Sequence, residues 1–171
     1  MAVISALSLT ACDETPLPSD GTSISSAAES QENSTGIGDI YGRTLESTQK
    51  NLGELLGTEL EATSPGLFSD NDDEEHWLLR KENSGKIAAF SYRFNAIDVA
   101  FRNERSYAVT FAAMDYDSDA VGAMKDYFDD FYGTDCAGET NGIYTWDIEQ
   151  DGMVMLYASS DMVILQFALK Q

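Results

Sequence analysis

The sequence is poor in the side chains from which most catalytic and metal centres are built. It contains one histidine, His76, and two cysteines, Cys12 and Cys136, among 171 residues. A Ser/His/Asp or Cys/His catalytic set would have to use His76, and no nucleophile motif lies near it. No glycine-rich loop has the spacing of a phosphate-binding motif. The sequence leaves catalysis open, but it favours a protein that is not an enzyme.

Basic residues are also scarce. Ten Lys and Arg residues stand against thirty Asp and Glu residues, for a net charge of −20. This balance argues against a nucleic-acid partner and against binding to anionic lipid through bulk electrostatics. The charge is unevenly distributed: residues 80–105 hold six basic and three acidic residues, whereas residues 115–161 hold twelve acidic residues and one basic residue, Lys125.

The N-terminal segment carries no charge from Met1 to Ala11 and is too short to span a bilayer. It runs into Leu9-Thr10-Ala11-Cys12, which resembles the lipobox of bacterial lipoproteins. The resemblance implies lipidation of Cys12 and a lipid-anchored, extracytoplasmic location, on the extracellular face or in the periplasm. Signal peptides begin with a basic region, yet the first basic residue is Arg43. We therefore expect residues 1–11 to be the end of a truncated signal peptide.

A polar linker follows the lipobox. Residues 12–36 are rich in Ser, Thr and acidic residues and contain no aromatic residue, so they cannot bury enough apolar surface to offset the entropy of ordering. We expect an acidic, disordered tether over 12–36 and a single folded domain over 37–171. An acylated Cys12 leaves Cys136 without an intramolecular partner; a Cys12–Cys136 bridge in a protein without the lipid is the alternative.

Hydrophobic periodicity predicts helices and strands within the domain. A helix is expected from Ile40 to Leu56, before Gly57, and another from Asp119 to Tyr132, before Gly133. A loop is expected over 61–75, and a hairpin turn at 83–85. Strands are predicted over 77–81, 86–94, 97–102, 107–113, 143–149, 153–159 and 162–169.

The chain repeats its own pattern. A shift of 56 positions places residues 87–114 on residues 143–170 without a gap, and Phe111-Ala112 then falls on Phe167-Ala168. We interpret this as a tandem α-β-β-β pseudo-repeat, with halves 37–114 and 115–171. The expected fold class is α+β, with helices packed on one face of an antiparallel meander sheet. This architecture is similar to that of secreted β-lactamase-inhibitor proteins and of small outer-membrane assembly lipoproteins, and the resemblance implies no site residues.

One short acidic motif is compatible with calcium. Asp115, Asp117 and Asp119 alternate like the first ligands of a Ca²⁺ loop, with Asp126 at the twelfth position. The sixth position is Ala120 where such a loop requires Gly. The alternative is that these carboxylates cap the following helix, which is the reading we favour. No cofactor is otherwise expected.

Strand alternation predicts a second, solvent-facing side of the sheet. This side would carry small residues and arginines: Ser91, Arg93, Asp98, Ala100, Arg102, Ala108 and Thr110. An anionic ligand or an acidic partner could lie flat on it, with contacts to Ser91, Arg93 and Arg102.

These features favour a membrane-tethered extracytoplasmic lipoprotein of the cell envelope that acts as a binding or interaction module. Its partners would be the membrane, through the lipid anchor, and an envelope protein or anionic ligand. A structural subunit of an envelope-assembly complex is the alternative. An envelope hydrolase using paired carboxylates is a third, although nothing selects a pair among thirty acidic residues.

Overall fold

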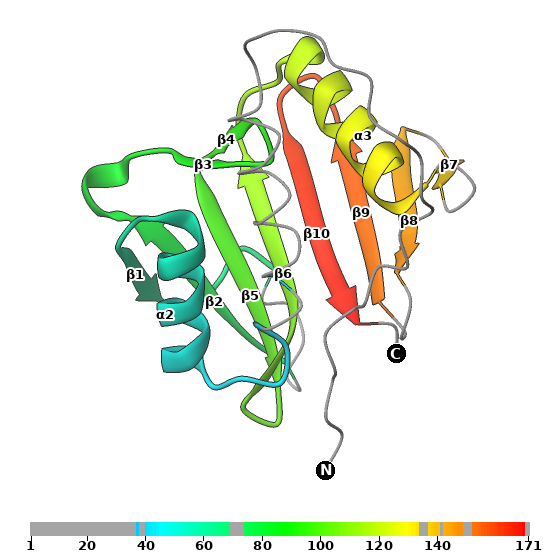
Figure 1. The fold of residues 1–171 in the computed structure, drawn as a ribbon. Coiled ribbons are helices and arrows are strands. Elements are labelled where there is room, and N and C mark those ends of the chain that lie inside the picture. Colours follow the sequence, from blue (N-terminus) through cyan, green and yellow to red (C-terminus); the bar gives the residue numbers. More distant parts are fainter. Residues whose placement is uncertain are drawn as a thin grey trace, which may run out of the picture.

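The computed structural model describes residue 37 and residues 40–68, 74–133, 137–140, 142–148 and 152–169. Within these ranges, eight strands form one antiparallel sheet in the order β1-β2-β5-β6-β10-β9-β8-β7. The helices α2 (Leu45–Leu56) and α3 (Ser118–Tyr132) lie on the same face of this sheet (Figure 1). The α+β fold class predicted from the sequence is confirmed.

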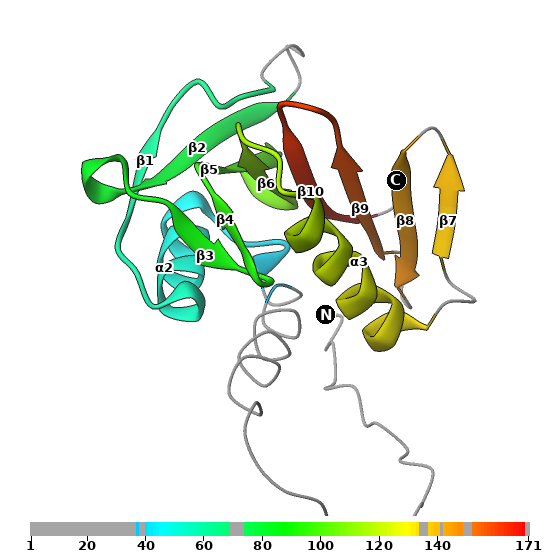
Figure 2. The same ribbon diagram turned by 90° about the horizontal axis from the view of Figure 1, so that it is seen from above.

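The large sheet divides into two halves, each formed by a helix and the four-stranded meander that follows it. The first half contains β1 (Leu60–Thr63), β2 (Glu75–Lys81), β5 (Ala96–Arg102) and β6 (Arg105–Ala113). The second contains β7 (Ala137–Thr140), β8 (Ile143–Ile148), β9 (Gly152–Ala158) and β10 (Val163–Leu169). The halves join where β6 pairs with β10. Figure 2 shows α2 beside the β1 end and α3 beside the β8 end.

The repeating unit therefore has four strands, and the three-strand unit expected from the sequence is wrong. The missing strands are β1, which overlaps the start of the predicted loop 61–75, and β7. Both are only four residues long and sit at the two edges of the sheet. Segments so short carry too little apolar alternation to be recognised as strands.

The 56-residue shift holds for the last two strands of each half. The shift places β5 on β9 from end to end. It also places β6 on a range that contains all of β10. It fails upstream, because residues 86–94 are not a single strand in the large sheet. They form β3 (Ile87–Ala89) and β4 (Tyr92–Phe94), a separate two-stranded sheet. Phe90 and Ser91 turn the chain between them, with φ angles of 50° and 60°.

The expected hairpin between 77–81 and 86–94 is also absent from the described chain. The residues between them form a short 3₁₀ helix, Glu82–Ser84, and β2 pairs instead with β1 and β5. The first helix begins later than expected, at Leu45, because Gly42 adopts a left-handed conformation with φ of 71°. The second helix is confirmed to within one residue and ends before Gly133.

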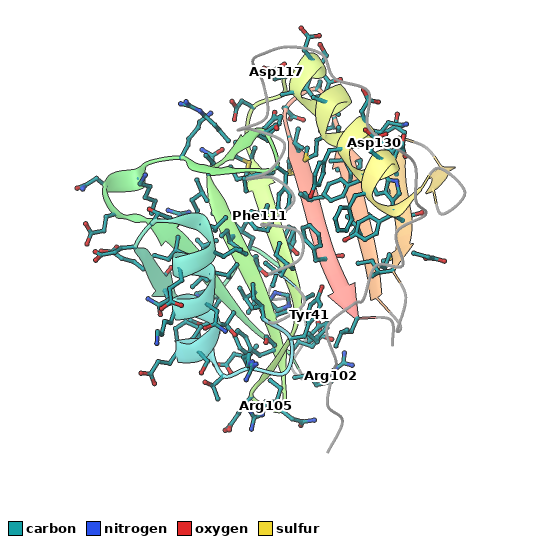
Figure 3. All side chains as sticks on the ribbon, viewed as in Figure 1. Tyr41, Arg102, Arg105, Phe111, Asp117 and Asp130 are labelled. Atoms are coloured by element: carbon teal, nitrogen blue, oxygen red, sulfur yellow. The ribbon has the colours of Figure 1, made fainter. Side chains whose placement is uncertain are left out.

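The core lies between the helices and the sheet and is rich in aromatic rings (Figure 3). Measured between ring centroids, Phe128 of α3 lies 5.3 Å from Trp146 on β8, and Phe90 lies 5.5 Å from Phe111 on β6. All four side chains are at most 1% exposed. Burial of an aromatic side chain contributes on the order of 2 kcal/mol, so this cluster ties α3 and the β3–β4 turn to the sheet.

The opposite face of the first half is not the solvated surface expected from the sequence. Asp98, Ala100, Ala108 and Thr110 are each less than 5% exposed. The connection between β1 and β2 covers part of this face, since the amide of Leu67 donates a hydrogen bond to Asp98 Oδ2 at 2.5 Å. Strand alternation assigned these residues correctly to the second face, but it did not reveal the segment that packs there.

Candidate functional site

An open groove of about 670 Å³ lies between α2 and the edge of the sheet. It lies beside β1, the terminal strand, and Figures 1 and 2 both show α2 alongside that strand. The groove is lined by Glu46, Gln49, Lys50, Gly53, Glu54, Gly57, Thr58, Glu59, Leu60, Glu61 and Glu82.

A tight reversal of the chain forms one end of this groove. Gly57 ends α2 in the left-handed conformation, with φ of 60°, and its N–H donates to the carbonyl of Glu54 at 3.3 Å. The amide of Thr58 then donates to the carbonyl of Gly53 at 3.0 Å. A Cβ atom at position 53 would lie only 3.0 Å from the backbone carbonyl oxygen of Thr58. The glycine that weakens the helix therefore lets β1 return close against it.

Gln49 links the helix to the strand across the groove. Its Nε2 donates a hydrogen bond of 2.5 Å to the backbone carbonyl of Leu60, the first residue of β1. The buried side chains of Thr48 and Leu52 fix the opposite face of α2 against the core. The helix is thus held beside the terminal strand, with the side chain of Gln49 reaching over to it.

The groove is strongly acidic. Five glutamates line it against one lysine, Lys50, which lies 3.8 Å from Glu54 in an exposed pair. An exposed pair of this kind contributes little binding energy of its own. The field in the groove is therefore negative and favours a cationic or basic ligand.

A second polar cluster lies on the sheet face opposite the helices, and it was not predicted from the sequence. His76 is 9% exposed, and its Nδ1 lies 2.7 Å from Oδ1 of Asp98 on β5. Its Nε2 lies 3.8 Å from Oε2 of Glu74, and Glu74 pairs through Oε1 with Arg102 Nη2 at 2.5 Å. Arg102 in turn lies over the ring of Tyr107, with its Cζ 4.9 Å from the ring centroid.

The hydrogen bonds in this cluster favour an ionised Glu74. Tyr107 and Arg102 both donate to its carboxylate and lower its pKa below the ordinary value of 4.5. Desolvation and the hydrogen bond to Glu74 raise the pKa of Tyr107 to about 12. A general acid in glycoside hydrolysis needs a raised pKa, so Glu74 is poorly suited to that role.

The His76–Asp98 contact also fastens the β1–β2 connection to the sheet. The amide of Gly66 donates to the carbonyl of His76 at 2.9 Å. A Cβ atom at position 66 would lie 2.2 Å from Asp98 Oδ2 and 2.7 Å from His76 Cβ. Only glycine fits at this close approach, and the cluster therefore has a structural role. Sequence patterns could not reveal it, because nothing in them indicates that β2 pairs with β5.

The three residues expected to share one binding face do not share it. Ser91 and Arg93 lie at the β3–β4 hairpin and line a shallow cavity of about 240 Å³ with Lys86 and Asp115. Asn95 directly follows β4, and its backbone N–H donates a hydrogen bond to the backbone carbonyl of Ala112 near the end of β6. Arg102 instead pairs with Arg105 at the start of β6, the opposite end of that strand.

The acidic motif before α3 is engaged within the protein. Asp117 Oδ1 accepts hydrogen bonds from the amides of Asp119 and Ala120 at 3.0 and 3.1 Å, which confirms the predicted N-cap. Asp115 Oδ2 pairs with Lys86 Nζ at 2.6 Å. No group of three or more His, Cys, Asp or Glu side chains suited to a metal ion occurs among the described residues. The lipidation candidate Cys12 lies outside the described residues.

Comparisons with family models, curated proteins and solved structures find no match for this chain. In the part of the chain that the structure describes, no helix is long and apolar enough to cross a membrane. The groove between α2 and β1 is the feature of the described chain that bears most directly on function.

Proposed function

We propose that this protein is a lipid-anchored, extracytoplasmic binding module of the bacterial cell envelope. The proposed address depends on the lipobox-like Leu9-Thr10-Ala11-Cys12 and on the polar linker that follows it. Two acyl chains on Cys12 would suffice for stable anchoring, since each buried CH₂ contributes about 0.8 kcal/mol. The linker would hold the domain away from the bilayer.

The groove between α2 and β1 is the observation that carries the binding role. Its volume of about 670 Å³ falls in the range of ligand sites, roughly 300–1,000 Å³. It is open, acidic, and bordered by β1, the terminal strand of the described sheet. These properties fit a macromolecular segment better than a small apolar ligand, which would require an enclosed apolar pocket.

The anchoring is tested by comparing wild type with Cys12→Ser in cells fed an alkyne-tagged fatty acid. We expect label and membrane association in the wild type, and loss of both in the variant. A variant that remains membrane-bound with unchanged mass would show that Cys12 carries no anchor.

The binding role is tested by photo-crosslinking in intact cells. A photoreactive residue replaces Lys50, which lines the groove and has a 72% exposed side chain. The matched control carries the same residue in place of Asp126, which is exposed on α3. Capture of one partner from position 50 and not from position 126 supports the proposal. Equal capture from both positions, or none from position 50, contradicts a role for the groove.

A structural subunit of an envelope-assembly complex is the second candidate. Leu67, Phe68 and Met114 are 36%, 41% and 58% exposed, and Leu67 and Met114 line the same shallow cavity. On the face opposite the helices, Met155 and Tyr157 of β9 are also only half-buried. Apolar side chains gathered in this way are typical of surfaces covered in an assembly. Self-association that Met114→Ser and Phe68→Ser abolish, in analytical ultracentrifugation, would favour this candidate.

A further inference from the structure

We propose that the groove accepts an extended, basic polypeptide segment, which adds to the sheet as a new strand beside β1. This inference rests on the proposed binding role and names the chemistry of the partner. The sheet ends at β1, which pairs with β2 on one side and with no other strand in the described ranges. A free edge of this kind is a template for strand addition.

The peptide groups of Leu60 and Ala62 point toward this free edge. The carbonyl of Leu60 accepts its hydrogen bond from Gln49 on α2, across the groove. In a β-strand, the N–H and C=O groups of one residue point to the same side, and residues two apart share that side. The N–H and C=O groups of Ala62 therefore also point away from β2.

The register of β1 and β2 leads independently to the same assignment. Gly66, which follows β1, donates its amide to the carbonyl of His76, so the peptide group of His76 points toward the β1 side. Arg80 lies four positions further along β2, shares that direction and is paired with Glu61. The peptide N–H and C=O groups of Glu61 therefore point toward β2, and those of its neighbours Leu60 and Ala62 point away from β2.

Gln49 occupies the place that the backbone of an added strand would take. Its amide group donates to an edge carbonyl just as a peptide N–H would, at 2.5 Å. An incoming segment can displace this single side chain and bond to the peptide groups of Leu60 and Ala62. The helix α2 then forms the second wall, so that the segment lies between a helix and a strand edge.

The charge of the lining selects the sequence of the segment. Glu46 and Glu54 approach from α2, Glu59 precedes β1, and Glu82 follows β2, with Lys50 as the only cation in the lining. Side chains of an added strand alternate between the two faces, so lysine or arginine at alternate positions would meet the glutamates on α2. An acidic segment would be repelled.

The test uses the full chain and three synthetic heptapeptides, measured by fluorescence anisotropy at low salt. The first alternates Lys with Val, the second alternates Glu with Val, and the third is the Lys peptide N-methylated at alternate residues on the hydrogen-bonding edge. We expect saturable binding of the Lys peptide only, weakening with salt. N-methylation is expected to weaken binding by about fivefold or more, because it removes backbone donors and keeps the charge.

Two variants locate the binding. Glu54→Lys/Glu59→Lys is expected to weaken binding of the Lys peptide by about tenfold. Asp126→Lys/Asp130→Lys makes the same charge change on exposed residues of α3 and is expected to change it less than about twofold. Ala62→Pro removes the outward N–H at a position where an edge strand tolerates proline, and its fold is checked by circular dichroism.

Three outcomes would overturn the inference: no binding of the Lys peptide, equal weakening by the two charge variants, or unchanged binding of the N-methylated peptide. The last comparison requires no mutation and is independent of folding defects. Crosslinking of a partner from position 50 would still support a binding module if the peptide test failed. Failure of the crosslinking with success of the peptide test would retain the affinity of the groove for basic peptides and reject its role in binding a partner in the cell envelope.

Discussion

Gln166 on β10 lies directly opposite Thr110 on β6, and its Nε2 donates a hydrogen bond to Thr110 Oγ1 at 3.0 Å. The two residues are 56 positions apart, which is the offset that aligns the two halves of the sequence. This offset pair is therefore also a register pair, at the junction where the two halves of the sheet meet. Phe111 and Phe167 are related by the same offset, and their ring centroids lie 6.2 Å apart across this junction, although Phe111 pairs with Leu165 and Phe167 with Val109.

The Thr110–Gln166 pair is expected to couple the two halves energetically. Thr110 is 3% exposed, and Thr110→Val should lower the free energy of unfolding by about 1 kcal/mol, since it removes the acceptor. A double-mutant cycle with Gln166→Leu, measured by urea unfolding, should give an interaction of about 0.5–1 kcal/mol. Strictly additive effects would show that the bond contributes nothing to joining the halves.

Gly66→Ala is expected to destabilise the fold by about 1–3 kcal/mol, because the new methyl group would clash with Asp98 and His76. Gly122 on α3 provides the matched control, since a Cβ atom there meets nothing within 4 Å. Gly122→Ala should stabilise the protein by up to about 1 kcal/mol through helix propensity. Thermal unfolding of both variants tests this prediction. Equal changes in melting temperature would contradict the close approach at Gly66.

The Glu74 carboxylate is expected to stabilise the fold only above the acidic range. Its pKa is lower in the folded protein than the ordinary value of 4.5. Its contribution is therefore present above about pH 4.5 and is lost as the pH falls through the folded pKa. Urea midpoints of wild type and Glu74→Gln should differ at pH 7 and converge toward about pH 3.

Tyr107→Phe provides the second variant for this cluster, because it removes a hydrogen bond that lowers the pKa of Glu74. It should reduce the pH dependence without abolishing it, since Arg102 remains. Parallel curves for wild type and Glu74→Gln across the whole range would contradict the assignment of the lowered pKa to Glu74.

Asp117→Ala is expected to destabilise α3 by about 1 kcal/mol, because two amides lose their N-cap acceptor. Thr44 is the N-cap of α2 but makes no side-chain capping bond, so Thr44→Ala should have a much smaller effect. Calcium should leave the melting temperature of the wild type unchanged relative to EDTA. A calcium-dependent rise that Asp117→Ala removes would restore the metal interpretation of Asp115, Asp117 and Asp119.

Much of the fold could be predicted from local pattern. The helix over 118–132, the strands β5, β6, β8, β9 and β10 and the 56-residue offset follow from periodicities that are independent of distant contacts. The edge strands β1 and β7 could not be predicted, since four residues are too few to show a period. The break at Phe90-Ser91 was also hidden, because neither residue is typical of a left-handed turn.

The candidate site could be predicted far less well. Alternation placed Asp98 and Arg102 on one face. Their partner His76 lies on β2, whose neighbours were assigned wrongly, and their partner Glu74 directly precedes β2. Gln49 and Leu60, eleven residues apart, face each other across the groove. The groove exists because β1, a strand that was not predicted, is the terminal strand of the described sheet.

The sequence by itself determined the composition, the helical and strand periods, the expected lipid anchor at Cys12 and the repeat, because each is a property of neighbouring residues. The tertiary structure alone decided which strand stands at the edge, which face the β1–β2 connection covers, and which glutamates share a groove. Those are consequences of strand order, and strand order is set by contacts between segments that lie far apart in the chain.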